Sequence, residues 1–197
     1  MNEVKENIIK KAVELFNQVG IRSCSMDDIC RELGISKKTL YQYYATKDEL
    51  VEAMLRRHAE RAKECAEQDE TSHVSALDVL LHILASTQKM KDVRRVPPLL
   101  FDLKKYYPQQ YEDHVRALAR INKESMARLI KRGIEEGDFR ADIDSELCAT
   151  FFSELNQQAM NNITRLAQME NFAEFSIFAV DLLIRGIVNE QGLAKLK

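Results

Sequence analysis

Residues 25–47 read SMDDICRELGISKKTLYQYYATK and predict two short helices joined by a tight turn. Ser25 is placed to cap the first helix, and Asp28, three positions later, completes the pattern of a capping box. Gly34 follows the first helix, where a residue that tolerates a positive φ is favoured. Ser36 is then placed to cap the second helix, so this stretch alone predicts a helix-turn-helix hairpin.

The second helix of the hairpin has a polar and cationic outer face. Leu40 and Tyr44 lie four residues apart and therefore share the inward face. The side chains left facing outward are Lys37, Lys38, Thr39, Gln42 and Tyr43. Lysine suits the acceptors of guanine, glutamine suits adenine and a threonine methyl suits thymine, so these five are candidates for reading base edges in a DNA major groove. An ordinary solvated helix face is the alternative that the residues leave open.

Four other side chains lie at helix starts or at the edge of the hairpin, where DNA-binding proteins contact phosphates. They are Ser25, Ser36, Tyr41 and Lys47. Lys47 also begins the next expected helix, and the N–H groups and dipole at a helix N-terminus favour a phosphate. We therefore expect these four to fix the position of the hairpin on DNA.

The hairpin resembles the DNA-binding domain of the TetR family of bacterial transcriptional regulators. The residues that carry the resemblance, in fixed register, are Ser25, Ile29, Leu33, Gly34, Ile35, Ser36, Lys37, Thr39, Leu40, Tyr41, Tyr43, Tyr44, Lys47, Glu49 and Leu50. Lys38 stands where the family often has glycine, and Tyr44 stands where it often has phenylalanine. The resemblance covers only the N-terminal part of the chain. It implies a DNA-reading head and a helical body that binds a small effector and pairs with a second copy.

The composition of the whole chain favours helices. Its 197 residues include three prolines, six glycines and no tryptophan, while Leu, Ala, Glu, Lys and Arg dominate. We therefore expect an all-α protein long enough to bury a sizeable core. No uncharged apolar run is long enough for a membrane span, and MNEVKENIIKK at the start lacks the apolar core of a signal peptide. A soluble, cytoplasmic protein with no membrane partner is expected.

Charge and helical pattern divide the chain into a head and a body. The formal net charge is −2, yet residues 1–47 hold eight Lys and Arg against six Asp and Glu. This asymmetry fits a DNA-reading head on an acidic body, because binding to DNA depends on local charge. We expect a helix-turn-helix DNA-binding domain over residues 1–47 and an effector-binding and dimerisation domain over 48–197. A lever helix that begins at Lys47 would join them.

Apolar periodicity and end signals predict the helices that surround the hairpin. Their expected ranges are 4–19, 47–67, 76–90, 97–107, 108–136, 145–168 and 172–189. The first would cover the hairpin as the third helix of the head. The second would be a rod about 30 Å long. Gly133, near the end of the longest helix, would permit the close approach of a neighbour.

Two sets of residues are candidates for the roles that the resemblance gives to the body. An effector pocket among the lever helix, the two helices after it and the long helix would be lined by His58, His82, Phe101, Tyr106, Tyr107, Tyr111, His114 and Met126. A four-helix interface between two copies would use Phe151, Leu155, Phe175, Leu182 and Gly186. Taken singly, each pocket residue has core packing or surface exposure as its alternative, and each interface residue has packing within one copy.

The spacing of the cysteines and the absence of catalytic motifs limit the classes of protein that the sequence can represent. Cys24, Cys30, Cys65 and Cys148 show no paired or zinc-ligand spacing, so we expect small buried thiols in a reducing compartment. Redox sensing by Cys24 or Cys30 is the alternative. The sequence has no nucleotide-binding glycine loop, no GxSxG or HExxH motif and no histidines at ligand spacing, so no enzyme, metal or cofactor is expected.

The function that the sequence favours is a ligand-responsive repressor. It would bind a palindromic operator in double-stranded DNA as a homodimer and release it when an unknown small molecule binds. An activator and a cysteine-based redox sensor are alternatives within the same class. A helical module that binds a ligand or a protein partner, without operator affinity, is the alternative from a different class.

Overall fold

A computed structural model describes residues 3–71, 73–89, 97–161 and 172–196. The described residues are largely helical and form no strand beyond an isolated antiparallel bridge between Phe139 and Val188. The predicted all-α class is confirmed. In the part of the chain that is described, no helix combines the length and the apolar character that a bilayer crossing requires.

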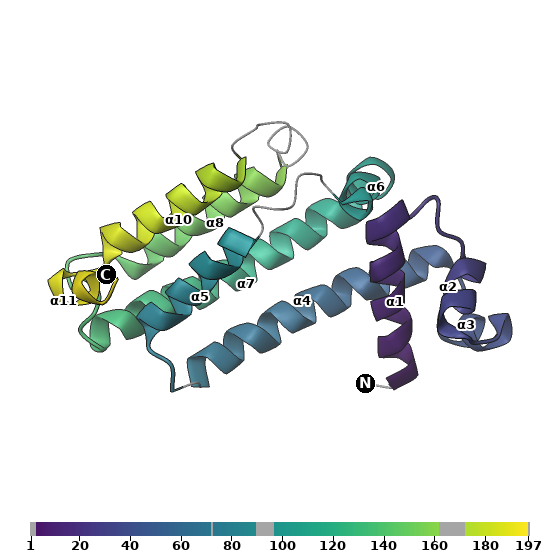
Figure 1. Cartoon of the computed structure of the whole chain (residues 1–197), viewed down its shortest axis with the longest axis horizontal. Helices are drawn as coiled ribbons and strands as arrows, with labels where there is room; N and C mark the ends of the chain where they lie inside the picture. The colour runs from purple at the N-terminus through teal and green to yellow at the C-terminus, as the bar shows by residue number, and fades with distance from the viewer. Residues whose placement is uncertain (1–2, 72, 90–96, 162–171, 197) are drawn as a thin grey trace. The chain divides into compact units, whose positions relative to one another are not determined.

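Figure 1 shows the helices of the described residues in chain order. They are α1 (Glu3–Val19), α2 (Met26–Leu33), α3 (Lys37–Tyr43), α4 (Lys47–Thr71), α5 (Ala76–Lys89), α6 (Pro98–Tyr106), α7 (Pro108–Glu135), α8 (Ser145–Asn161), α10 (Phe172–Ile187) and α11 (Glu190–Lys195).

Most of the observed helix ends lie within two residues of the predicted ones. Helix α4 continues four residues past the predicted end at Glu67, because QDET contains neither glycine nor proline to stop it. The predicted continuation of α8 from 162 to 168 lies outside the described residues, as does Met90, the predicted end of α5. Apolar periodicity did not predict α11, because a helix of only six residues is too short to show the pattern.

The chain forms two compact units, which are described separately. Unit 1 contains Met1–Arg61 and Val96–Val115, and unit 2 contains Ala62–Arg95 and Arg116–Lys197. The divisions fall inside α4 and inside α7. Unit 1 therefore holds α6 together with the predicted DNA-binding head. The functional division at residue 47 stays a prediction.

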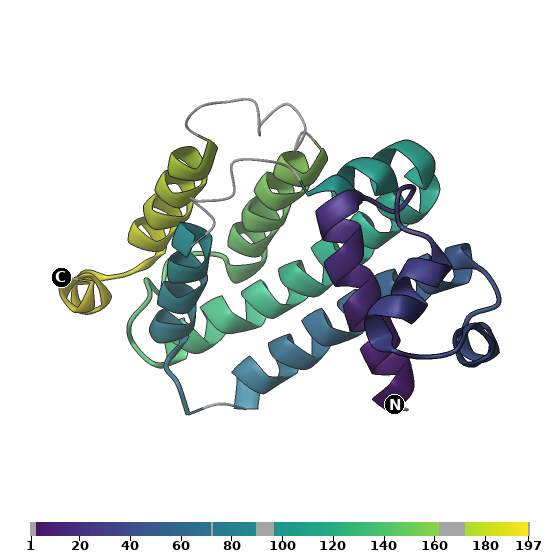
Figure 2. The same cartoon turned by 45° about the vertical axis from the view of Figure 1, so that its right-hand side comes forward.

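The core of unit 1 lies where α1 packs against both α2 and α6 (Figure 2). Helix α2 in turn packs against α3. The fully buried side chains of this core come from every helix of the hairpin and its neighbours, and include Ile8, Ala12, Phe16, Ile21, Ile29, Leu40, Leu50 and Val51. Helix α1 thus buries the predicted apolar stripe against the hairpin, although Val19, at its end, is exposed.

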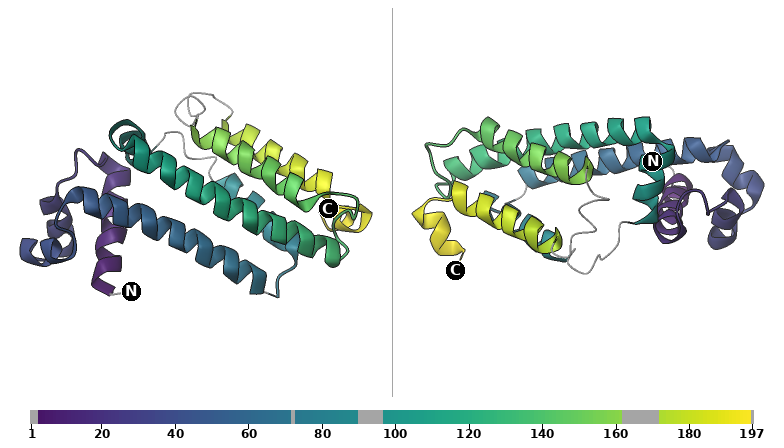
Figure 3. Two further views of the ribbon diagram at one scale, coloured as in Figure 1. Left: turned by 180° about the vertical axis from the view of Figure 1, so that it is seen from behind. Right: turned by 90° about the horizontal axis from the view of Figure 1, so that it is seen from above.

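The core of unit 2 joins α5, α7 and α10, and includes Leu77, Leu80, Ile130, Phe139 and Ile184. Helix α8 runs along α7 (Figure 3), and the Ser153 hydroxyl donates a hydrogen bond to the Ala119 carbonyl at 3.2 Å. A Cβ on Gly133 would lie 2.2 Å from the Phe139 ring. The prediction that Gly133 permits a close approach is therefore confirmed.

A small polar cluster fastens α11 to the end of α7. Asn189 caps α11 by accepting the N–H of Gly192 at 2.9 Å, and its side-chain amide donates to the Gly137 carbonyl at 2.8 Å. Lys195 donates to both carboxylate oxygens of Asp138, at 2.7 and 2.8 Å. Because the Asp138 side chain is buried, this lysine supplies the opposite charge that a buried carboxylate needs.

Candidate nucleic-acid interface

The two helices of the hairpin are capped as the sequence predicts. The Ser25 hydroxyl accepts the N–H of Asp28 at 3.1 Å, and the Asp28 carboxylate accepts the N–H of Ser25 at 2.8 Å, which completes the capping box. Gly34 ends α2 in the left-handed conformation with φ of +65°. Ser36 then accepts the N–H of Thr39 at 3.1 Å and starts α3.

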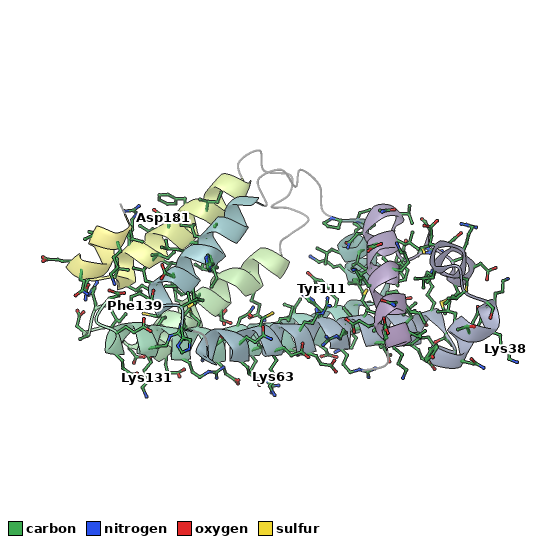
Figure 4. The ribbon with its side chains drawn as sticks, turned by 60° about the horizontal axis from the view of Figure 1, so that its bottom comes forward. Lys38, Lys63, Tyr111, Lys131, Phe139 and Asp181 are labelled. Atoms are coloured by element: carbon green, nitrogen blue, oxygen red, sulfur yellow. The ribbon has the colours of Figure 1, made fainter. Side chains whose placement is uncertain are left out.

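The inward face of α3 anchors the helix, which leaves its outer face available. Leu40 and Tyr44 are buried, as predicted. Lys38, Tyr41 and Gln42 are exposed, whereas Thr39 and Tyr43 are half-buried. Figure 4 shows Lys38 at the edge of unit 1 with its side chain directed away from the helices. The cation, the amide and the phenol can therefore reach a nucleic acid without any change in the core.

Lys37 differs from Lys38 because it is already paired. Its Nζ lies 2.6 Å from Oδ2 of Asp27 on α2, and both side chains are exposed. The hydrogen bond and the charge of Asp27 raise the pKa of Lys37. A base or phosphate contact by Lys37 must replace this ion pair, which the sequence did not reveal.

Asp28, the residue after Asp27, has a carboxylate that stays charged. Hydrogen bonds from Ser25, followed by the one from Arg31, lower the pKa of Asp28 to about 2. The Ser25 hydroxyl donates to Asp28 at 2.6 Å, and the Ser36 hydroxyl lies 2.8 Å from that of Thr39. These two hydroxyls serve the helix caps in the DNA-free protein.

Lys47 lies at the first position of α4 and is half-buried. Thr46 accepts the N–H of Glu49 at 3.1 Å, and Glu49 accepts the N–H of Ala45 at 2.8 Å. The start of α4 is therefore well ordered by local hydrogen bonds. A cation at such a start can contact a phosphate together with the helix N–H groups.

The eight predicted effector residues separate into several groups. Phe101 and Tyr106 are exposed on α6, where they line a surface hollow of about 560 Å³ with residues of the α1–α2 turn. Tyr107 and the buried Tyr111 belong to the same unit, whereas His82 is exposed on α5 in unit 2. Met126 packs against the core cluster of unit 2. The pocket itself therefore stays a prediction.

His58 and His114 do lie together. His58 Nδ1 and His114 Nε2 are 2.9 Å apart, across α4 and α7 within unit 1. Burial lowers the pKa of His58, and burial together with the charge of His58 lowers that of His114 to about 4. Both rings are neutral at pH 7, so one can donate and the other accept. The His58 residue is exposed overall, and Met54 and Leu55 supply the buried face of α4.

The predicted interface residues lie largely on the surface. Phe151 and Leu155 on α8, and Leu182 and Gly186 on α10, are exposed. Phe175 belongs to α10, but its side chain lies outside the described set. The opposite face of α10, with Ile184 and Ile187, supplies the core.

The cysteines differ in exposure. Cys24 and Cys30 are buried, and burial raises the pKa of both thiols, which keeps them protonated and weakly reactive at neutral pH. Cys148 is half-buried. The expectation of burial is wrong for Cys65, which is exposed on α4, because its neighbour Ala66 takes the buried position in that turn.

The comparison with known protein families finds a match in the region that contains this hairpin. Residues 8–54 match the family model described as bacterial regulatory proteins, tetR family. This range contains most of α1, the whole of α2 and α3 and the start of α4.

Two curated proteins extend the similarity beyond the hairpin. The chain is 34% identical over 104 residues to the uncharacterized HTH-type transcriptional regulator YvaF of Bacillus subtilis (strain 168), covering 52% of this chain and 53% of that protein. It is 20% identical over 149 residues to the HTH-type transcriptional repressor KstR2 of Mycolicibacterium smegmatis, covering 75% of this chain and 73% of that protein. The chain thus spans about half the length of YvaF.

A solved structure resembles the chain over nearly all of its length. The TetR transcription regulator from Haloarcula marismortui has a TM-score of 0.71 at 20% identity, covering 96% of this chain and 100% of that one. At this identity the likeness concerns the fold.

Proposed function

We propose that the chain is a member of the TetR family of bacterial regulatory proteins, which the match over residues 8–54 and the similarity to YvaF support. On that basis it is a DNA-binding transcriptional regulator, and more finely a ligand-responsive repressor that binds a palindromic operator as a homodimer. The observation that carries this proposal is the α2–α3 hairpin, with two capped helices, a left-handed glycine between them and a polar outer face on α3. Such a repressor acts in the cytoplasm on double-stranded DNA.

Helix α3 reads base edges in the major groove. Lys38 and Gln42 are exposed and suit guanine and adenine acceptors, while Thr39 offers a methyl group to thymine. Lys37 joins them once DNA replaces Asp27 as its partner, at little cost because exposed ion pairs contribute little. Tyr43 completes the reading face.

The second set of residues holds phosphates. Lys47 contributes a cation at the start of α4, and Tyr41 contributes an exposed phenol. Ser25 and Ser36 are the N-cap residues directly before α2 and α3, where the helix N–H groups also attract phosphate. These contacts fix register and carry no sequence information.

Two copies pair through the exposed apolar faces of α8 and α10. Phe151 and Leu155 are one turn apart on α8, and Leu182 and Gly186 are one turn apart on α10, all of them exposed in the single chain. A second copy would cover these faces, as large exposed apolar patches commonly mark interfaces. Two heads reading two half-sites then raise the affinity for a palindrome.

The effector acts by shifting populations. A small molecule held by some of the eight predicted residues stabilises a shape of the dimer whose heads no longer match two successive major grooves. A ligand with equal affinity for both shapes would change nothing. The aromatic and histidine side chains of this set on α6 and α7 would supply the apolar walls and polar groups that such ligands need.

The direct test is selection of duplexes from a random library, followed by fluorescence anisotropy with the selected sequence over a range of salt concentrations. We expect salt-sensitive binding that the double variant Lys37→Ala/Lys38→Ala weakens about tenfold or more, since each base contact is worth about 1–3 kcal/mol. The control is Lys63→Ala/Lys131→Ala, which removes the same charge from exposed positions on α4 and α7 (Figure 4).

Two outcomes would contradict the proposal. If both double variants weakened DNA binding equally, the protein would bind DNA through its general positive charge and not through base contacts made by α3. A selection that returns no preferred sequence, with the fold intact, would favour a helical module that binds a ligand or a protein partner.

A further inference from the structure

One face of α6 receives the turn between α1 and α2. Pro98, Asp102 and Tyr106 are spaced four residues apart and therefore share this face. Together with Gly20 and Arg22 of the turn, they form part of the hollow described above. The turn leads directly into the cap of α2, so whatever holds the turn also sets where the hairpin begins.

Asp102 makes the closest polar contact at this face. Its carboxylate Oδ2 accepts the backbone N–H of Arg22 at 2.9 Å, although the two residues are 80 positions apart in the chain. The residue is only 9% exposed. A carboxylate in such a place needs hydrogen bonds to offset its lost hydration. The bond to Arg22 is therefore a specific anchor for the backbone of the turn.

The absence of a side chain at Gly20 leaves room for the Asp102 carboxylate. The φ of Gly20 is +88°, which favours glycine, and a Cβ there would lie 2.7 Å from Asp102 Oδ2 and 3.5 Å from Pro98 Cβ. The side chain of Arg22 is held as well, with its guanidinium 4.8 Å from the centre of the Tyr106 ring. The turn is thus fixed by main-chain and side-chain contacts at once.

A second tie lies at the other end of the hairpin. The Tyr107 hydroxyl, one residue after α6, donates to Oδ1 of Asp48 at 2.6 Å. Asp48 is the second residue of α4 and follows Lys47. Burial, and then the hydrogen bond to Asp48, raise the pKa of Tyr107. Helices α2 and α3 lie in the chain between the two tied points.

We propose that α6 and the residue after it form a clamp that sets the position of α2 and α3, with Asp102 holding the entry to the hairpin and Tyr107 holding its exit. This inference rests on the proposed function, because the position of the hairpin matters through operator reading. Asp102 and Tyr107 are positioning residues and act through Arg22 and Asp48.

The test uses three substitutions in the full chain. Asp102→Leu removes the acceptor while keeping a side chain that branches at the same atom, Asp102→Asn keeps one acceptor oxygen, and Tyr107→Phe removes a single hydroxyl. Asp113→Leu, at an exposed carboxylate of α7 in the same unit, is the matched control. Operator affinity is measured well below the melting temperature of each variant, and amide exchange of residues 21–43 is measured without DNA.

We expect Asp102→Leu and Tyr107→Phe each to weaken operator binding by about fivefold to tenfold, as for one lost hydrogen bond. Asp102→Asn should restore binding to within about threefold, and the control should leave it unchanged. Exchange of the Arg22 amide should quicken in Asp102→Leu and recover in Asp102→Asn. A merely structural role would lower the melting temperature without moving the affinity of the folded protein.

Three results would overturn the clamp. They are an unchanged affinity in both Asp102→Leu and Tyr107→Phe, an Asp102→Asn variant as weak as Asp102→Leu, and unchanged amide exchange in all variants. Should the wild-type protein bind no selected duplex, the proposed function fails. The amide-exchange measurement alone then tests the clamp. If Asp102→Leu does not fold, Tyr107→Phe is used in its place.

Discussion

The charged side chains on the hairpin are not equivalent, although the sequence presents them as a row. Lys38 is exposed at the edge of α3, whereas Lys37 is bound to Asp27. Asp28 keeps its charge with a pKa of about 2. In the proposed complex Lys37 must therefore exchange Asp27 for DNA, and the proposed phosphate contacts are simpler to isolate.

Lys47 offers that isolated contact. We expect Lys47→Ala to weaken binding to all duplexes by a similar factor and to reduce the slope of log K against log salt by about 1, because one phosphate contact is lost. Gln42→Ala should instead change the preferred base at one position and leave the slope unchanged. Anisotropy titrations at several salt concentrations distinguish the two, and a Lys47→Ala slope equal to that of wild type would remove this residue from the phosphate set.

The pair of histidines between α4 and α7 makes stability depend on pH. The pKa of His114 is about 4 in the folded protein, below its ordinary 6.5, so the unfolded chain binds the extra proton between these values. The free energy of unfolding should therefore fall by about 1–3 kcal/mol as pH drops from about 6.5 to about 4, and this contribution is complete above pH 6.5. Urea unfolding at several pH values measures this change.

His114→Gln should flatten that pH dependence relative to wild type. His82→Gln, at an exposed histidine of α5, is the control and should keep the wild-type slope. Equal slopes in all three proteins would mean that the His58–His114 contact does not survive in solution.

At the scale of the elements, local signals predicted most helix ends. Ser25 and Ser36 start their helices as expected, and Gly20, Gly34 and Gly137 all adopt positive φ where helices stop. These features depend on neighbours within a few residues, which the sequence displays directly.

Contacts between distant segments were not predictable in the same way. Nothing near Asp102 in the sequence indicates that it accepts the N–H of Arg22. The exposure of Cys65 was also missed, because a periodic pattern does not tell which edge of an apolar stripe a neighbour will cover. Burial and partner choice at these residues depend on tertiary packing.

Gly133 gives an element-scale prediction. Gly133→Ala places a methyl group against the Phe139 ring and should lower the free energy of unfolding by about 1–3 kcal/mol, despite the better helix propensity of alanine. Phe139→Leu in the same chain should recover part of this loss. Chemical denaturation of the two single variants and the double variant measures the coupling. Strictly additive effects would show that α7 relaxes away from the contact.

At the scale of the whole molecule, the exposed apolar faces of α8 and α10 predict the assembly. Phe151 is 54% exposed and Leu182 is 57% exposed in the single chain. Replacing either by glutamate should convert a dimer into a monomer, because each substitution enters a twofold interface twice and buries two charges. Sedimentation equilibrium at micromolar concentration measures the mass, and operator affinity should fall together with it.

Val4→Glu is the control for this experiment, since it adds the same charge at an exposed apolar position on α1. It should leave the mass unchanged. A monomeric wild-type protein would contradict dimerisation, and a dimer that both glutamate variants preserve would place the interface elsewhere.

The exposure of Cys65 among three thiols that are buried or half-buried has a practical consequence. A maleimide dye or a nitroxide should react first at this position, because the other thiols are shielded and burial raises the pKa of each. A dimer would then carry one reporter on each α4 without any substitution in the chain. The distance between the two reporters, followed as candidate molecules are added, would show spectroscopically which compounds change the spacing of the paired helices.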